Sequence, residues 1–250
     1  FVNLKSREFW GGLPDTVQCK VLDGTFDERL DQISGSKSMD IAQNMINSSI
    51  NDKISTITGS LNIVSENFEL LNSNGLNFKD KATYISGIIN AESETGEILV
   101  SGIGHASGRT LANFSAGQIG NDAKTMGVES INPQKVDSDS YSIIFEPYSV
   151  GELLAFVVAA NFNFKTFSEK KSCFSDDYEK EIAVKEFSLV DDPHVPEGIG
   201  TKSVDDEGVA TRKKTLIEKG VFKNTYSNLF DSYKEGESST GNASRPGSPM

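Results

Sequence analysis

The chain has 250 residues, and 24 Lys and Arg against 36 Asp and Glu give it a formal net charge of −12. So acidic a chain does not fit the class of proteins that bind duplex nucleic acid through a basic surface, so we expect no direct nucleic-acid partner. With 36% apolar residues, the length predicts one or two domains with a sizeable core. No apolar run reaches the ~18 residues of a membrane span and no signal peptide is recognisable, which predicts a cytoplasmic protein without membrane contact.

Residues 1–136 are expected to form a first domain that mixes helices with antiparallel strands. From residue 23 to residue 51, apolar positions recur at intervals of three and four, which predicts two amphipathic helices broken at Gly35. From residue 54 to residue 89 the apolar period changes to two, which indicates strands. The dipeptide Asn74-Gly75 between apolar flanks predicts a hairpin there.

The end of this domain shows one more strand and one more helix. A strand is predicted over 96–103, and the apolar spacing from Leu111 to Ala123 allows a helix. Between them stand Gly102, Gly104 and Gly108, whose G-x-G-x-x-x-G spacing is one residue longer than the dinucleotide fingerprint. We interpret these glycines as a strand-to-helix turn, with Ser107 or Thr110 available as a helix cap.

Residues 137–250 are expected to form a second, strand-rich domain that contains one buried, capped helix. Tyr141 to Phe145 has the composition of a strand. Ser149 and Glu152 have the spacing of a capping box, and the apolar run Leu153 to Ala160 that follows predicts a buried core helix. The predicted fold class is therefore α+β throughout.

Further along the second domain, another hairpin and another helix are indicated. Lys219-Gly220 lies between two short apolar stretches and predicts a two-residue hairpin turn, and a short helix is expected over 226–233. Cys19 and Cys173 match neither a C-x-x-C pair nor a disulfide framework, so both are expected to be free thiols.

The polar residues show no complete catalytic pattern. His105 and His194 each lack a second His at metal-ligand spacing, which argues against a typical zinc site. Asp191, Asp192 and His194 are interpreted as a solvated loop, because Pro193 suits a turn. The run Asp205 to Glu207 lacks the alternating ligands of a calcium loop and is interpreted as a charged turn.

An ordered series of motifs resembles the TldD/PmbA family. It consists of FWGGLP (9–14), DERL (27–30), NSNGL (72–76), LVDDP (189–193), SVDDEGV (203–209), LIEKGVF (216–222) and STGNASR (239–245). Each motif is weak alone, but the series spans most of the chain in the order of the family. The resemblance implies that the chain is incomplete at both ends.

The metal motif of that family can be located by its spacing. Members of the TldD type are similar to zinc metallopeptidases and carry H-E-x-x-x-H, with two His ligands and a Glu base. Counting back from Ser172 to Ser175 (SCFS), which resembles the family's Ser-x-Phe-Ser stretch, places these positions at Ala155, Phe156 and Ala160. Methyl groups and a phenyl ring offer zinc no lone pair and accept no proton from water. The expectation is therefore no metal site and no catalytic residue in this chain.

The chain thus resembles the TldE or PmbA type, which lacks the motif. The resemblance implies a non-catalytic subunit of a TldD-like zinc metalloprotease complex that helps to capture peptides or unfolded segments. It implies a TldD-type partner in a heterodimer, or else a homodimer, with zinc in the partner and no cofactor in this chain. Strand addition is the expected mode of capture, because backbone pairing requires little sequence preference.

Six residues of the DDEG and TGNA motifs are the candidates for the peptide-binding groove. They are Asp206, Glu207, Gly208, Thr240, Gly241 and Asn242. For each, the alternative is a turn that stabilises the domain, since Gly208 and Gly241 can supply positive φ angles. Two other functions stay open: a metallopeptidase active in its own right with ligands outside this stretch, and a protein-binding modulator of DNA gyrase.

Overall fold

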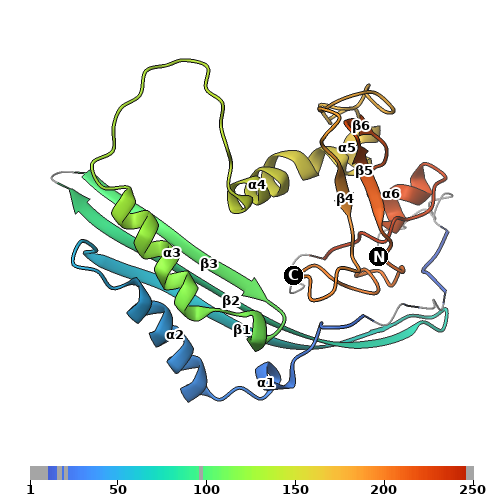
Figure 1. The fold of residues 1–250 in the computed structure, drawn as a ribbon. Helices are drawn as coiled ribbons and strands as arrows, with labels where there is room; N and C mark the ends of the chain where they lie inside the picture. The colour runs from blue at the N-terminus through green and yellow to red at the C-terminus, as the bar shows by residue number, and fades with distance from the viewer. Residues whose placement is uncertain (1–10, 16–18, 20–21, 96–97, 246–250) are drawn as a thin grey trace, which may run out of the picture.

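The computed structural model describes residues 11–15, 19, 22–95 and 98–245 of the chain. Phe9 and Trp10 of the first family motif therefore lie outside the described residues. Figure 1 shows a long twisted sheet with two helices along one face, and a smaller unit of short helices and strands at the other end of the molecule. None of the described helices has the length and apolar character needed to cross a bilayer.

The predicted pair of helices near the N-terminus is confirmed. Helix α1 spans Glu28–Asp31 and helix α2 spans Gly35–Ser49. The side chain of Asp27 caps α1, and that of Ser34 caps α2 by accepting a hydrogen bond from the Lys37 N–H. Gly35 is thus the first residue of the second helix, directly after the break.

The first sheet follows the predicted antiparallel order. Strands β1 (Thr56–Leu71), β2 (Asn77–Thr95) and β3 (Ile98–Gly108) lie in the order β1-β2-β3. The turn between β1 and β2 contains Gly75 at φ +88°, as the Asn-Gly dipeptide predicts. Leu71 pairs with Asn77 directly after this turn, so the hairpin is in full register.

Helix α3 (Ala116–Glu129) packs with α2 on one face of the sheet, after a short 3-10 turn η1 (Leu111–Asn113). The core between these layers contains Met45, Ile89, Ala91, Ile119 and Ala123. Gly102 and Gly104 lie inside β3, so their interpretation as a strand-to-helix turn is wrong. A Cβ on Gly104 would lie 1.9 Å from the Ile119 carbonyl oxygen, so glycine is required there by the close approach of α3.

Residues 131–146 form an arch without helix or strand between the two units. Figure 1 shows this segment rising from the end of α3 and returning at α4. The predicted strand at Tyr141 to Phe145 is therefore wrong: among the described residues nothing pairs with it, and a strand needs a neighbour for its backbone groups. Ile144 is 99% exposed.

The helix after the arch differs from the prediction in two ways. Helix α4 (Pro147–Leu153) begins with Pro147 in its first turn, so the capping box at Ser149 is wrong. It continues as the π-helical turn η2 (Leu154–Val158) and the 3-10 turn η3 (Ala159–Phe162), before α5 (Phe164–Ser168). The burial prediction is wrong as well, because Phe156 is 82% exposed and Val157 beside it is 60% exposed.

The second sheet is small. Strands β4 (Leu189–Asp191), β5 (Lys214–Glu218) and β6 (Val221–Phe222) are antiparallel in the order β4-β5-β6. Lys219 and Gly220 have φ angles of 47° and 82°, which confirms the two-residue hairpin turn. Helix α6 (Leu229–Lys234) follows, and Phe162, Leu216, Ile217 and Phe222 form the core. Because the strands are short and loops make up most of this unit, the expectation of a strand-rich domain is too strong.

Candidate functional site

An open groove of about 500 Å³ runs between the helix after the arch and strand β4. The helix contributes small or apolar residues, and the opposite wall is β4 itself with Leu216, Tyr226 and Asn242 at the base. The helix residues are Gly151, Leu154, Ala155 and Ala159. The groove is therefore lined by apolar side chains and by few polar ones.

The helical wall contains a rare backbone feature. In η2 the Ala159 N–H donates to the Leu154 carbonyl, an i→i+5 bond. Turns of this kind occur as single wide turns in helices, frequently at functional sites. The wide turn overlaps residues 155–160, where the family resemblance places a motif whose two His are five residues apart.

The side chains at these positions do not fit a zinc ion. Ala155 lines the groove with a methyl group, and the phenyl ring of Phe156 is largely exposed to solvent. Within the described residues, no group of three or more His, Cys, Asp or Glu is placed to hold a metal ion. His105 packs against Tyr148 with ring centroids 4.0 Å apart and the ring planes tilted by 46°, and His194 Nε2 lies 3.1 Å from Thr211 Oγ1. No reaction step through a metal follows from these residues.

The polar groups of the groove are fixed by partners. The Asp191 carboxylate accepts hydrogen bonds from Lys214 Nζ at 2.6 Å and from Asn242 Nδ2 at 2.7 Å. The Tyr226 hydroxyl donates to the Ala159 carbonyl at 2.7 Å, which ties the helical wall to the base of the groove. Burial, and secondarily Asp191, raise the pKa of Tyr226. A neutralised carboxylate and a protonated phenol can orient a ligand, but they supply no free base.

The interpretation of Asp191 and Asp192 as part of a solvated loop is wrong. Asp191 is the last residue of β4, and its partner Lys214 is 7% exposed. Asp192 forms an ion pair with Lys213 at 2.8 Å. These carboxylates thus neutralise two consecutive lysines at the start of β5.

The DDEG residues, 205–208, are joined to the TGNA segment, residues 240–243, by buried hydrogen bonds, and we call this pair of segments the clasp. Asp205 accepts hydrogen bonds from the N–H groups of Glu207, Val209 and Ala243 at 2.9–3.0 Å. Asp206 accepts from the Arg245 N–H at 2.8 Å. Burial is the main cause that raises the pKa of Asp205. The interpretation as a charged turn is confirmed for the turn, but Asp205 and Asp206 are 3% and 5% exposed.

The other predicted residues are also engaged within the chain. Glu207 accepts from the Leu229 N–H at 2.8 Å, and burial raises its pKa. Gly208 and Gly241 have φ angles of +87° and +73°, which the alternative role in turns requires. Thr240 Oγ1 donates to Asn242 Oδ1 at 2.8 Å. Of the six candidates, Asn242 lines the groove. The peptide-binding role of all six stays a prediction.

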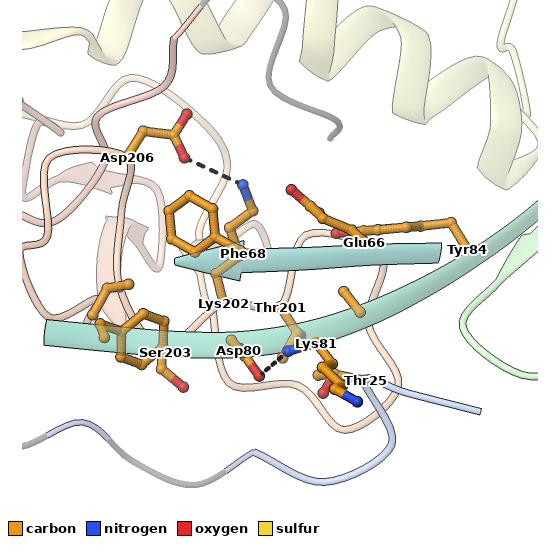
Figure 2. Close-up of a pocket in the computed structure, with 13 residues that line it drawn as sticks. Thr25, Glu66, Phe68, Asp80, Lys81, Tyr84, Thr201, Lys202, Ser203 and Asp206 are labelled. Atoms are coloured by element: carbon orange, nitrogen blue, oxygen red, sulfur yellow. Dashed lines mark hydrogen bonds and ion pairs between the residues drawn. The ribbon is translucent and has the colours of Figure 1, made fainter. Parts of the chain in front are cut away.

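The clasp also reaches the first sheet. A Cβ on Gly208 would lie 2.3 Å from Leu76 Cδ2, so this turn packs against the tip of the β1–β2 hairpin. A cavity of about 30 Å³ remains beside this contact, which is room for about one water molecule. Figure 2 shows Lys202 directed towards Asp206 at one side of it, with Nζ and Oδ1 3.4 Å apart. This cavity is too small for a peptide.

Arg109 is a buried residue that sequence reasoning missed. Its guanidinium donates to the carbonyls of Gly198, Ile199 and Thr201 at 2.7–3.1 Å and lies 4.0 Å from the centroid of the Tyr84 ring. It thereby holds the loop that leads into DDEG against the sheet. No sequence signal marks an arginine at the end of a strand for such a role.

The fold has close relatives among solved structures. It superposes on a protein of Thermotoga maritima described as a candidate modulator of a DNA gyrase, with a TM-score of 0.87, 20% identity and coverage of 93% of this chain and 54% of that one. TldE of Thermococcus kodakarensis gives a TM-score of 0.80 at 20% identity, over 97% of this chain and 55% of that one. At these identities the likeness is one of fold.

The sequence comparisons add the family. A metalloprotease PmbA homologue of Haemophilus influenzae is 27% identical over 126 residues, which is 50% of this chain and 28% of that protein. The chain thus spans less than a third of this relative and just over half of the solved chains. Residues 138–250 match the PmbA/TldA metallopeptidase C-terminal domain. These matches assign residues 138–250 to the C-terminal domain of the TldD/PmbA family, and the ordered motifs and the shared fold support the same family for the whole chain.

Proposed function

We propose that this chain is the non-catalytic subunit of a TldD-like zinc metalloprotease complex and that its groove holds an extended peptide. The observation that carries the proposal is the groove wall itself. At the position of the wide helical turn the chain presents alanine methyl groups, and the carboxylate of the groove is already bonded to Lys214 and Asn242.

Peptide capture by strand addition is supported by the edge of the second sheet. In the described part of the chain, β4 has β5 as its single strand neighbour, so its other edge is free beside the groove. Figure 1 shows β4 as the outer strand on the side of α4. Backbone groups at such an edge accept an added strand, and the small residues of the helix leave room for its side chains.

Pairing with a second subunit is supported by exposed apolar side chains. Ile144, Phe145, Phe156 and Val157 are between 51% and 99% exposed along the arch and the helix after it. Several large exposed apolar side chains in neighbouring segments are typical of a protein interface. In the proposed complex the TldD-type partner covers this surface and carries the zinc.

Two measurements test the proposal. The zinc content of the purified full-length protein, measured by elemental mass spectrometry, is expected to be well below one per chain, and one tightly held zinc per chain contradicts the proposal. Fluorescence anisotropy with a labelled decapeptide of alternating Ala and Thr tests the groove. Ala155→Trp fills the groove and is expected to weaken binding about tenfold or more, whereas Val157→Trp, at an exposed position of the same helix that does not line the groove, is the matched control. Equal effects of the two substitutions would contradict the site.

A further inference from the structure

A second cavity, of about 460 Å³, lies behind the groove and is separated from it by two chain segments. Tyr226 lines the groove, whereas its neighbours Thr225 and Ser227 line the cavity. In the same way Asn242 lines the groove and Thr240 lines the cavity. The TGNA motif and the segment after β6 therefore form a partition with one site on each side.

Within the described part of the chain, one cation of the cavity wall, Arg212, has no charged or hydrogen-bonded partner. Arg212, Lys213 and Lys214 are consecutive, and the two lysines form ion pairs with Asp192 and Asp191. Arg212 is exposed and lines the cavity, and among the described residues its guanidinium has neither an ion pair nor a hydrogen bond. Its five donors are thus available to a ligand, and their fork geometry matches a carboxylate or another planar oxyanion.

Another part of the cavity lining is aromatic. Phe164, Phe167 and Tyr178 line the cavity. The rings of Phe167 and Tyr178 have centroids 6.3 Å apart, and both pack on the buried ring of Phe222 at 5.6 and 5.7 Å. Because Phe222 holds the rings in place, this wall suits the flat or apolar body of a ligand with little loss of side-chain entropy.

The remaining lining residues are polar but uncharged, apart from one acid. The hydroxyls of Ser227 and Ser232 lie 2.6 Å apart, and the Ser227 N–H donates to Thr240 Oγ1 at 2.6 Å. Glu237 also lines the cavity. A ligand with several negative charges would meet this carboxylate and the field of a chain with net charge −12, so a single negative charge is favoured.

We propose that this cavity binds a monocarboxylate with an aromatic or bulky apolar body, held by Arg212 at its carboxylate and by the Phe167–Tyr178 wall at its body. Such a carboxylate has two sources, the free C-terminus of a peptide or a free aromatic acid. The first source rests on the proposed function, because a subunit that holds peptides would meet peptide termini next to its groove. The site itself depends only on the cavity residues.

Isothermal titration of the purified full-length protein with three probes tests this site. The probes are N-acetyl-phenylalanine, its C-terminal amide, and a pentapeptide that ends in Phe with a free carboxylate. The acid is expected to bind at least about tenfold more tightly than the amide, because a hydrogen bond to a charged partner is lost in the amide. A pentapeptide that binds about tenfold more tightly than N-acetyl-phenylalanine identifies the peptide terminus as the source, and equal affinities identify the free acid.

Three variants separate the cation from the aromatic wall. Arg212→Gln is expected to abolish the preference for the acid over the amide, whereas the adjacent Lys213→Gln is expected to keep it. Tyr178→Ala is expected to weaken both N-acetyl probes and to leave their ratio unchanged. Thermal melting of each variant controls for folding.

The proposal is overturned if acid and amide bind equally, if neither binds, or if Lys213→Gln removes the preference as Arg212→Gln does. A protein that carries zinc, or that does not bind the decapeptide, would instead contradict the proposed function. Neither result would change the conclusion drawn from this titration about the cavity.

Discussion

Replacing Arg109 by Met tests whether one buried guanidinium holds the second unit against the first sheet. The side chain is 1% exposed and donates to three loop carbonyls, while it stacks on the Tyr84 ring. A hydrogen bond to a charged group contributes about 1.5–3 kcal/mol, and a desolvated cation–π contact adds about 1–2 kcal/mol. Methionine fills similar space but leaves the three carbonyls without these donors.

The expected loss is smaller than the sum of these contributions. Burial of the charge costs free energy in the native protein, and in the described residues Arg109 Nη1 has no hydrogen-bond partner. We therefore expect Arg109→Met to lower the free energy of unfolding by about 3–5 kcal/mol. Arg109→Lys keeps the charge but lacks the planar fork, so its loss is expected to lie between those of wild type and Arg109→Met.

Urea unfolding followed by circular dichroism measures these losses, with a second spectroscopic probe to check two-state behaviour. The control is Lys79→Met, which removes an exposed ion pair with Glu69 at 2.7 Å and is expected to cost about 0–1 kcal/mol. If Arg109→Met costs less than about 1 kcal/mol, or no more than the control, the loop does not depend on this guanidinium.

Three further predictions concern the rest of the chain. The side-chain hydrogen bond from Arg29 lowers the pKa of Asp27 to about 2 from its ordinary 3.8, so this carboxylate stabilises the fold above pH ~4 and the stabilisation is lost as the pH falls through ~2. Between pH 7 and pH 3 this pKa shift allows a loss of at most about 1 kcal/mol, and because Arg29 is largely exposed we expect about 0.5–1 kcal/mol. In urea unfolding, the drop in stability between the two pH values should be smaller by this amount in Asp27→Asn, and an unchanged drop in that variant would contradict the assignment. Gly104→Ala should cost at least about 2–3 kcal/mol in the same assay because α3 would have to move away from β3, whereas Gly151→Ala, with open space at its Cβ, should be neutral or stabilising. Phe156→Ser should change the free energy of unfolding by no more than ~0.5 kcal/mol yet weaken co-elution with a TldD-type subunit; a large loss of stability would mean that the ring is buried in this chain.

The elements that local chemistry determines could be predicted from the sequence. Asn74-Gly75 and Lys219-Gly220 form their turns because the positive φ angles of Gly75, Lys219 and Gly220 depend on a few adjacent residues. The Ser34 cap likewise depends on a side chain and a backbone group three residues apart.

The burial of apolar segments could not be predicted in the same way. Tyr141 to Phe145 and Leu153 to Ala160 have the composition of a strand and of a core helix, but composition does not say which surface covers them. Among the described residues the first segment has no strand neighbour and the second is covered on one side. Tertiary contacts, or contacts with another subunit, decide such cases.

Two residues that family motifs mark lie at the groove, although Ala155 was expected in a buried core helix and not in a peptide groove. The motif positions lead to Ala155 and the TGNA series leads to Asn242, and both line the groove. Arg109 and Arg212 belong to none of the family motifs. Arg109 bonds a carbonyl 89 residues away, and Arg212 is singled out because its two neighbours already have partners. Both properties arise from contacts between distant segments, which a single sequence does not contain.

The wide turn in the groove helix also sets the rotational phase of that helix. A π turn holds one residue more than an α turn, so it rotates the residues after the turn by about 100° relative to the residues before it. Gly151 before the turn, Leu154 and Ala155 within it and Ala159 directly after it line the groove, whereas Phe162, three residues further on, enters the core with no exposed surface. Deleting one residue from Leu154–Val158 would rotate the residues before the turn relative to those after it. Gly151 could then not face the groove while Phe162 stays in the core. The extra residue therefore acts as a fixed angular offset, which allows one short helix to serve a ligand surface and a folding core at once.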